Sequence, residues 1–476
     1  MASITEVPVA PASPERFRAL LGDDYSLVEG AIDAAKILEG RVIWHVNSTA
    51  RGGGVAEMLQ SLLAYARGAG VDVRWLTIQG NPDFFRITKR IHNNLHGAPG
   101  DGGGLGKAEH RIYQDSLAES AAEIARLIQG GDLVYLHDPQ TGGITPHIKS
   151  RESSVVWRCH VGLDTPNDLA RRAWEFLRPY LEDVDAYVFS RRAFVWEGLD
   201  EDRLWLVPPS IDAFSPKNQD LAPEAVRSIL ARIGLAEDEG TAPVFRRHDG
   251  SQARVDRRAE LDQEGPIPAE APLLTQVSRW DRLKDPMGVL QSFADHVGHP
   301  GAHLLLAGPS VAGVADDPEG AEVLEEVQRE RNGLPAETKA RVHLATLPMD
   351  DVEENAVMVN AIQRRADVVV QKSLAEGFGL TVAEAMWKAR PVVASRIGGI
   401  QDQIVDGESG LLIDDPTDLA AAGAACDSLL ADPDRARAMG SAARERIRAE
   451  FLGSRHLVQY MELIERMLDR QDGNGG

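Results

Sequence analysis

Short apolar runs alternate with segments of helical periodicity along most of the chain. This alternation is typical of a parallel β-sheet with helices on both of its faces. The runs fall into two sets, and each set predicts one doubly wound, Rossmann-like α/β domain. Strands are predicted at 41–47, 71–78, 133–137, 155–161, 186–190 and 204–207 in the first set, and at 273–278, 303–307, 342–345, 367–371, 391–395 and 410–413 in the second.

The boundary between the two predicted domains follows the last strand of the first set, where two prolines and Asp212 interrupt the pattern. We therefore assign 41–212 to an N-terminal domain and 213–454 to a C-terminal domain, with 1–40 as an N-terminal extension. A further helix is predicted at 455–470, because six apolar residues recur there at helical spacing. These residues are Leu457, Tyr460, Met461, Ile464, Met467 and Leu468.

Residues 236–271 interrupt the alternation of the second domain. The segment is rich in charge, Gly and Pro, and this composition favours a mobile surface insertion. Its arginines also allow a second interpretation, a basic flap near an anionic substrate. They are Arg246, Arg247, Arg254, Arg257 and Arg258.

Length and charge narrow the classes of function. The chain has 476 residues, which suits two domains, and its formal net charge is −22. An acidic chain repels nucleic acids and anionic membranes, so neither is an expected partner. Cys159 and Cys426 are its only cysteines, which excludes a disulfide framework or a zinc-type spacing. Neither a signal peptide nor a membrane span is recognisable, so a cytoplasmic protein is predicted. A homo-oligomer is compatible with these features.

The strongest local motif runs from Glu376 to Glu384 and reads Glu-Gly-Phe-Gly-Leu-Thr-Val-Ala-Glu. It joins a predicted strand to a helix predicted at 381–388. Such a turn exposes backbone N–H groups at a helix N-terminus, which suits a phosphate or a polarised sugar. Both glutamates are acceptors for sugar hydroxyls. Taken alone, the segment also fits a tight turn followed by an ordinary helix.

A second motif follows the first strand of the second domain and contains Arg279 and Lys284. In open α/β sheets, ligands bind at the carboxyl ends of the strands. An arginine and a lysine there can hold a diphosphate and stabilise its charge as it departs. The alternative is a surface salt-bridge pair.

Three strand ends of the first domain carry further candidates. Asn47 opens Asn-Ser-Thr-Ala-Arg-Gly-Gly-Gly, which differs from the dinucleotide fingerprint and disfavours a nicotinamide cofactor. His137-Asp-Pro-Gln ends another strand, and His160 ends a third. Each has a plain structural alternative: a flexible turn, a strand-ending turn and a structural histidine.

The order Ser-Arg…Lys…Glu-Gly-Phe-Gly-Leu…Glu resembles the retaining GT-B glycosyltransferases, which include glycogen, sucrose and trehalose-type synthases. Glutamates with seven residues between them are a hallmark of that family, and Ser278 stands where it usually has glycine. The resemblance covers most of the chain. It implies two Rossmann-like domains facing a central cleft, a nucleotide-sugar donor, no obligatory cofactor, and a last helix that crosses back onto the first domain.

The same resemblance implies roles for the candidate residues. The donor diphosphate is bound by Arg279 and Lys284, and the ribose by Glu384. His160 lies beside the donor sugar and positions or polarises it. The remaining residues are assigned in groups: Glu376, Gly377, Phe378, Gly379 and Leu380 to the donor sugar, Gly53 and Gly54 to the donor phosphates, and Asn47, Asp138 and Gln140 to the acceptor.

Within that family the chain is most similar to the trehalose glycosyltransferring synthases, through 44–57, 84–93, 137–140, 277–285 and the arginine-bearing insertion. Those enzymes join glucose from a nucleoside diphosphate glucose to free glucose, giving α,α-trehalose, and can run in reverse. The donor base is not specified by the motifs, so ADP-, UDP- and GDP-glucose are all candidates. The resemblance implies reaction on one sugar face, with a donor phosphate oxygen taking the acceptor proton.

Two other functions are compatible with the same fold. A nucleotide-sugar 2-epimerase would need an acid and a base around the sugar C2, and a non-catalytic carbohydrate-binding protein would bind without turnover. The presence of Arg279, Lys284 and both glutamates argues against each. No Asp-x-Asp motif occurs where a donor-bound metal would need it, so no obligatory metal is predicted; the adjacent Asp316 and Asp317 fit a solvated loop.

Overall fold

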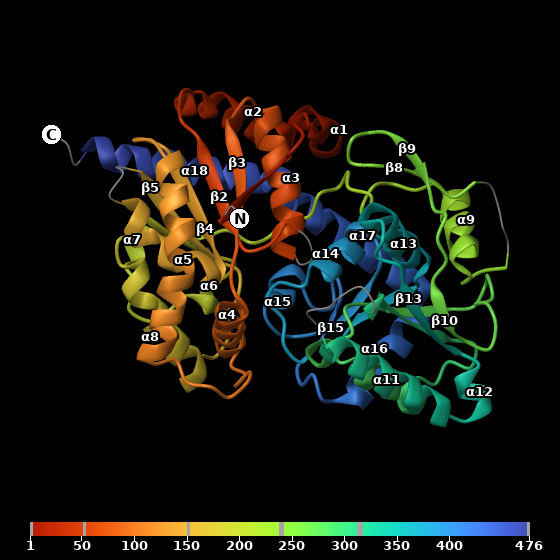
Figure 1. Cartoon of the computed structure of the whole chain (residues 1–476). Coiled ribbons are helices and arrows are strands. Elements are labelled where there is room, and N and C mark those ends of the chain that lie inside the picture. The colour runs from red at the N-terminus through yellow and green to blue at the C-terminus, as the bar shows by residue number, and fades with distance from the viewer. Residues whose placement is uncertain (1–2, 51–53, 150–152, 238–241, 312–317, 474–476) are drawn as a thin grey trace. The chain divides into compact units, whose positions relative to one another are not determined.

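The computed structural model describes residues 3–50, 54–149, 153–237, 242–311 and 318–473. The chain divides into two compact units. Unit 1 comprises Met1–Ser210 together with Gly453–Gly476, and unit 2 comprises Ile211–Leu452. Each is an α/β domain, as the sequence predicts, and is built on a sheet of seven strands, one more than the six predicted (Figure 1).

The sheet of unit 1 has six parallel strands and one antiparallel edge strand. Apolar residues fill the central strands, which are buried on both faces as parallel strands usually are. The order across the sheet is β1 (Ile4–Val7), β3 (Val73–Ile78), β2 (Ile43–Asn47), β4 (Leu133–His137), β5 (Ser154–Cys159), β6 (Ala186–Phe189) and β7 (Leu204–Leu206).

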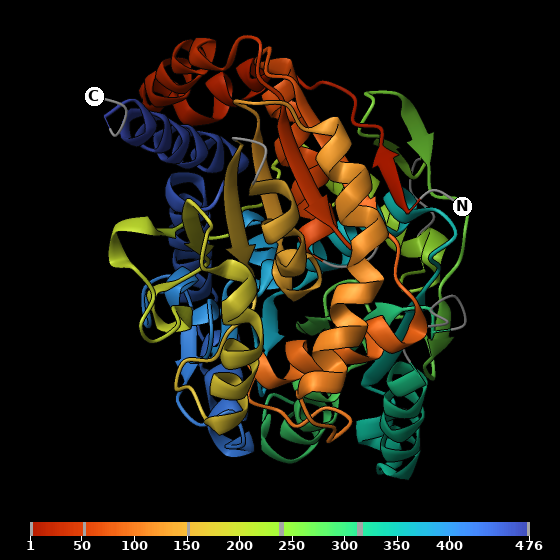
Figure 2. The ribbon, with the colours of Figure 1, turned by 60° about the vertical axis from the view of Figure 1, so that its left-hand side comes forward.

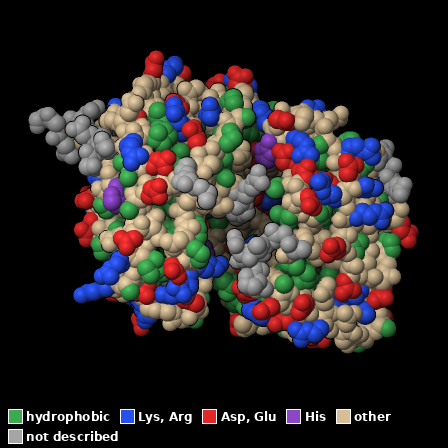
Figure 3. All heavy atoms as spheres, viewed as in Figure 1, with side chains coloured by type: hydrophobic (Ala, Val, Ile, Leu, Met, Phe, Trp, Pro, Cys, Tyr) green, Lys and Arg blue, Asp and Glu red, His purple; other side chains and the backbone are tan. Residues whose placement is uncertain are grey.

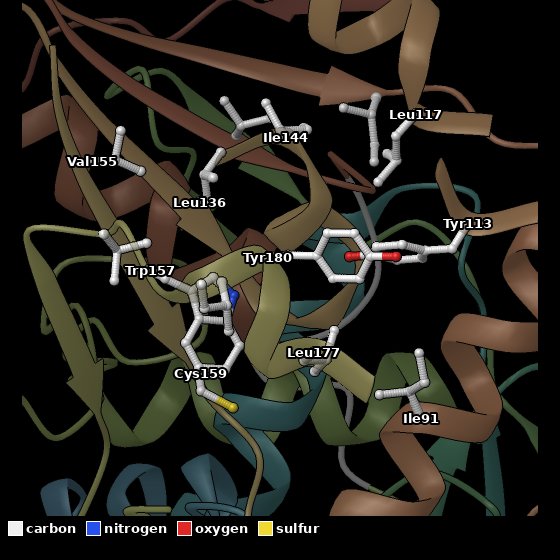
Figure 4. Packing of buried hydrophobic residues seen from close by; sticks show 14 of the residues in the cluster. Ile91, Tyr113, Leu117, Leu136, Ile144, Val155, Trp157, Cys159, Leu177 and Tyr180 are labelled. Carbon is white, nitrogen blue, oxygen red and sulfur yellow. The ribbon is translucent and has the colours of Figure 1, made fainter. Parts of the chain in front are cut away.

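Helices cover both faces of this sheet. One apolar core joins the sheet to α4 (Pro82–Leu95), α5 (Lys107–Leu127) and α8 (Asp168–Leu181). Figure 4 shows part of it, where the rings of Tyr113 and Tyr180 lie beside each other with centroids 5.2 Å apart. The core on the opposite face includes α3 (Gly54–Gly68) and α18 (Gly453–Gly473). The remaining helices are α1 (Arg18–Leu21), α2 (Tyr25–Ala34), α6 (Asp138–Thr141) and α7 (Thr145–Ile148).

The two ends of the chain both belong to unit 1. Residues 1–40, treated above as an extension, supply β1, which pairs antiparallel with β3, and α2, which lies beside α18 (Figures 1 and 2). The strand at 4–7 is half polar and only four residues long, so its apolar pattern is weak. On α18, the predicted apolar face packs into the core through Tyr460, Met461 and Ile464.

The sheet of unit 2 repeats the parallel pattern and again ends on one antiparallel strand. Its order is β10 (Glu260–Asp262), β13 (Val342–Leu347), β12 (His303–Pro309), β11 (Leu273–Val277), β14 (Val368–Gln371), β15 (Val392–Ser395) and β16 (Leu411–Ile413). The helices are α9 (Pro223–Ile233), α10 (Pro286–His296), α11 (Pro318–Gly333), α12 (Ala336–Lys339), α13 (Val352–Arg365), α14 (Leu380–Trp387), α15 (Ile400–Gln403), α16 (Leu419–Leu430) and α17 (Pro433–Glu450).

The predicted insertion is an ordered part of unit 2 in its described residues. It forms the hairpin of β8 (Val244–Arg246) and β9 (Gln252–Arg254), and then supplies β10. Arg247 forms ion pairs with Asp351 at 2.5 Å and Glu353 at 2.8 Å, and Arg257 pairs with the buried Glu354. These ion pairs tie the segment to the start of α13.

Acidic and basic side chains are interspersed on the visible faces of both units (Figure 3). None of the described helices combines the length and the apolar character that crossing a membrane requires.

Candidate active site

The turn between β14 and α14 depends on glycines at two positions. Gly379 precedes α14 with a φ of +87°, a left-handed conformation that favours glycine. Gly398, in the loop after β15, has a φ of +48° and lies against the turn. A Cβ atom there would lie 1.9 Å from the carbonyl oxygen of Glu376, so only glycine fits.

Two hydrogen bonds hold the backbone of this turn, one from the loop that contains Gly398 and one from the following helix, α15. The N–H of Gly399 donates to the carbonyl of Gly377 at 2.8 Å, and the side-chain amide of Gln403 donates to the carbonyl of Phe378 at 2.6 Å. Leu380 is the first residue of α14. The turn that the sequence predicts to bind a ligand is therefore held in place by Gly399 and Gln403.

Lys284 and Glu376 meet beside this turn, although they are 92 residues apart in the sequence. Lys284 ends the 3₁₀ turn Arg282–Lys284 that follows β11. Its Nζ atom lies 2.6 Å from Oε2 of Glu376, and the hydroxyl of Ser373 lies 3.5 Å from the same oxygen. The side chains are 18% and 10% exposed, so the pair is shielded but reachable. A cation and a carboxylate, both predicted from the sequence to bind the donor, thus lie side by side.

A second ion pair, absent from the sequence predictions, braces the first. Lys372 is buried directly after β14 and forms an ion pair with Asp285, and its Nζ also donates to the carbonyl of Pro416 at 2.6 Å. The N–H of Leu374 donates to the carbonyl of Leu283 at 2.7 Å. These contacts join the loop that carries Lys284 to the loop that carries Glu376.

Arg279 and Glu384 are the other two charged residues of unit 2 that the sequence predicts to bind the sugar donor, and their environments differ. Arg279 follows the end of β11, is 59% exposed and donates to Asp281 at 3.1 Å. Glu384 is buried in α14, with Oε1 3.5 Å from Nζ of Lys217. Sequence reasoning missed Lys217, because it lies in a loop just after the start of unit 2 and belongs to no recognisable motif.

In unit 1, Asp138 and His160 lie at the ends of the neighbouring strands β4 and β5. Oδ1 of Asp138 accepts a hydrogen bond from the backbone N–H of His160 at 2.8 Å. Asp138 has a φ of +62°, which Asp and Asn tolerate better than most residues. Burial raises its pKa to about 7 against the opposing effect of the hydrogen bond from His160. Gln140 is half-buried in α6.

The remaining candidates lie after β2. The side-chain carbonyl of Asn47 accepts a hydrogen bond from the indole of Trp75 at 2.8 Å, and its amide donates to the carbonyl of Thr49 at 2.7 Å. Both ends of this amide are therefore engaged inside the protein. Gly54 begins α3, whereas Gly53 lies outside the described residues.

A row of histidines extends from His160 into unit 1. Nε2 of His160 lies 3.1 Å from Nδ1 of His137, whose Nε2 lies 3.0 Å from Nδ1 of His45. The Nε of Arg158 donates to Nδ1 of His160 at 3.4 Å. Both ring nitrogens of His160 are therefore bonded within the protein, which leaves its backbone carbonyl and ring edge for other contacts.

The described residues contain no group of three or more His, Cys, Asp or Glu side chains arranged to hold a metal ion.

Comparison with known proteins identifies the family of the chain. Residues 45–196 match the family model described as trehalose synthase, N-terminal domain, and residues 257–446 match glycosyl transferases group 1. The trehalose synthase of Rubrobacter xylanophilus is 37% identical over 441 residues, which span 90% of this chain and 92% of that protein. The chain belongs to the trehalose synthase family of glycosyltransferases.

Two other similarities bear on this trehalose synthase family member. A trehalose phosphorylase of Pleurotus sajor-caju is 28% identical over 77% of this chain and 50% of that protein. The fold is that of the GT-B glycosyltransferases: the structure titled "Trehalose-6-phosphate from E. coli bound with UDP-2-fluoro glucose" superimposes with a TM-score of 0.65, at 14% identity, over 90% of this chain and 99% of that chain.

The histidine row of this family member predicts sensitivity to acid. Burial lowers the pKa of His45 to about 3 and the pKa values of His137 and His160 well below the usual value. A folded-state pKa below the unfolded value of about 6.5 means full stabilisation above pH 6.5 and progressive loss below it. We expect the free energy of unfolding to fall by about 1.4 kcal/mol per pH unit for each ring that stays neutral.

The measurement is urea unfolding between pH 8 and pH 5, compared with His45→Phe. Phenylalanine can still stack on Tyr135, as His45 does at 4.7 Å between centroids, but it takes up no proton. In His45→Phe, unfolding takes up one proton fewer. The free energy of unfolding of this variant should therefore fall less steeply as the pH is lowered, by roughly 1.4 kcal/mol per pH unit. Equal slopes for wild type and His45→Phe would contradict the lowered pKa of His45. Asp138 acts in the opposite direction, since its raised pKa costs stability as the pH rises through 7.

Proposed function

We propose that this protein transfers glucose from a nucleoside diphosphate glucose to free glucose, with retention at the anomeric carbon, to form α,α-trehalose. The observation that carries the proposal is the Lys284–Glu376 pair at 2.6 Å beside a glycine-supported helix N-terminus. One site thereby offers a cation for a diphosphate, a carboxylate for sugar hydroxyls and exposed N–H groups. The names of the relatives and their coverage of the chain favour trehalose chemistry.

The assigned roles follow this chemistry. Arg279 and Lys284 hold the diphosphate, and Glu384 holds the ribose. Glu376 and the backbone of 377–380 hold the donor sugar. His160 fixes the position of the donor sugar through its backbone, since both of its ring nitrogens are engaged. Asp138 and Gln140 belong to the acceptor side, and Asn47 supports the loop beside them.

In the proposed reaction the sugar–phosphate bond breaks while the acceptor oxygen attacks from the same face. A donor phosphate oxygen takes the acceptor proton, so no side-chain base is needed. Lys284 and the N-terminus of α14 stabilise the charge that develops on the departing diphosphate. The reverse reaction would return glucose from trehalose to a nucleoside diphosphate.

A product assay tests this proposal. The protein would be incubated with ADP-, UDP- or GDP-glucose, with and without glucose, and the sugars identified by NMR. Glucose-dependent α,α-trehalose is the expected result. Release of nucleotide without trehalose would indicate another acceptor, and binding without turnover would indicate a non-catalytic protein.

A trehalose phosphorylase is the second candidate, because a phosphorylase is similar over 77% of this chain. It would use inorganic phosphate in place of a nucleoside diphosphate. A parallel incubation of trehalose with phosphate or with ADP, UDP or GDP separates the two. Consumption of trehalose with phosphate alone would favour the phosphorylase.

Glu376→Gln is expected to lower kcat by about a hundredfold while leaving the affinity for the nucleoside diphosphate within about threefold. The glutamine keeps the size of the side chain but loses the charge that orients Lys284 and binds the sugar. Turnover and calorimetric titration of the nucleotide are the measurements. Glu326→Gln is the control, since Glu326 pairs with Arg282 on the surface, and it should behave as wild type. Equal loss of turnover and nucleotide affinity in Glu376→Gln would contradict a sugar-binding role.

A further inference from the structure

Arg158 carries a buried charge that the proposed chemistry does not use. It lies in β5, its side chain is 0% exposed, and its guanidinium is bonded on three sides. Nη1 donates to the hydroxyl of Tyr460 at 2.5 Å and lies 3.0 Å from Nε2 of His456, while Nη2 donates to the carbonyl of Val207 at 3.1 Å. Within the described residues, no carboxylate forms an ion pair with it. Burial raises the pKa of the Asp138 carboxyl and its electrostatic attraction to Arg158 opposes this effect, but no salt bridge joins the two, and burying a cation outside an ion pair is costly.

The guanidinium can donate hydrogen bonds but cannot accept them. Nδ1 of His160 and Nε2 of His456 must therefore present lone pairs to Arg158. Because burial keeps both rings neutral, the proton of His160 lies on Nε2 and that of His456 on Nδ1. The Nδ1 proton of His456 then points to Oγ of Ser210 at 2.9 Å.

The same argument determines the tautomers of the other histidines in the row. The Nε2 proton of His160 is donated to Nδ1 of His137, and the Nε2 proton of His137 is donated to Nδ1 of His45. One arginine therefore selects the tautomer of every histidine in the row. The ring of His160 is bonded at both nitrogens and its backbone N–H is bonded to Asp138, so the residue has little freedom at the end of β5.

We propose that Arg158 is a positioning residue for glycosyl transfer, which orients His160 by dictating its tautomer. The C-terminal helix α18 takes part, because its His456 and Tyr460 hold the guanidinium in place from the other side. This inference rests on the proposed function, in which His160 lies beside the transferred sugar. It makes the last helix of the chain a support for the site rather than only a cover for the sheet.

The first test needs no substitution. In wild-type protein with ¹⁵N-labelled histidine, long-range ¹H–¹⁵N spectra should show His160 protonated at Nε2 and His456 protonated at Nδ1, with signals assigned from His160→Gln and His456→Gln. Protonation of His160 at Nδ1 would overturn the proposal. This readout does not depend on turnover, so it stands even if the product assay finds another reaction.

The second test is Arg158→Met, which keeps an unbranched apolar stem and removes every donor. In folded protein, verified by circular dichroism and thermal unfolding, we expect an Nδ1-protonated form of His160 to appear. With the donor and acceptor that the product assay identifies, kcat should fall by roughly tenfold to a hundredfold, with KM for the donor within about threefold, because a small displacement near the reacting atoms has effects of that size. An unchanged tautomer or an unchanged kcat would overturn the proposal.

His343→Gln is the matched control. His343 is also a buried histidine in a histidine pair, with Nε2 2.9 Å from Nδ1 of His303, but it lies in the sheet of unit 2. Its substitution should reduce stability and leave both the His160 signals and kcat as in wild type. If this control lowered kcat as much as Arg158→Met, the effect would be one of stability and the positioning role would fail.

Discussion

Lys284→Ala is expected to lower kcat by roughly a hundredfold to a thousandfold, the usual cost of removing a group that stabilises developing charge in a shielded site. The Nζ of Lys284 lies 2.6 Å from Glu376, and its loop is held by the Lys372–Asp285 pair. The measurement is the initial rate of nucleotide release with saturating nucleoside diphosphate glucose and glucose.

Arg282→Ala provides a matched control for this prediction. Arg282 lies in the same 3₁₀ turn, is 50% exposed and pairs with Glu326 at 2.7 Å on the surface. Its loss removes one positive charge from the same segment, and exposed pairs contribute little to stability. The Arg282→Ala protein should keep nearly full turnover. If Lys284→Ala also kept it, the assignment of Lys284 to the diphosphate would be wrong.

Gly398→Ala is expected to lower turnover by about a hundredfold or more and to destabilise unit 2 by roughly 3 kcal/mol. The added methyl group would lie 1.9 Å from the carbonyl oxygen of Glu376, so the 376–379 turn must move away from the loop that supports it. A shift of that size would separate Glu376 from Lys284. Steady-state kinetics and urea unfolding would measure the two effects.

Gly407→Ala separates this clash from backbone strain. Gly407 also has a positive φ, +79°, but a Cβ atom there meets nothing within 4 Å. The substitution should therefore cost about 1 kcal/mol of stability through its backbone conformation alone and leave kcat unchanged. A similar loss of turnover in the two variants would show that strain, rather than displacement of the Glu376 turn, is responsible.

The parallel strands of both sheets could be predicted because each is a short apolar run, and the central ones are buried on both faces. Their predicted ranges differ from the observed ones by at most a few residues. The antiparallel edge strands could not be predicted, because β1 is half polar and β10 lies in an arginine-rich segment. Edge strands are stabilised by pairing with one neighbour and by ion pairs such as Arg331–Asp262, which depend on residues far away in the sequence.

Some residues of the candidate site could likewise be predicted from the sequence, and others could not. The Glu376–Glu384 motif and Lys284 could be recognised because their residue types follow strand ends in a characteristic order. Their partners could not be recognised. Lys217 and Lys372 lie in unremarkable loops, and Arg158 reads as an ordinary strand residue because arginine is seldom fully buried. Only the fold brings Arg158 next to His456, 298 residues later in the chain.

The pairing of β1 with β3 covers the backbone of β3 on the outer side of the unit 1 sheet. Without Ile4–Val7, the edge of β3 would present a row of unpaired backbone N–H and C=O groups over Trp75–Ile78, a segment rich in apolar side chains. Such an open edge can pair with another chain and start aggregation. By pairing with β3, Ile4–Val7 cover this edge, on the far side of β2 from the strands β4 and β5 that precede Asp138 and His160.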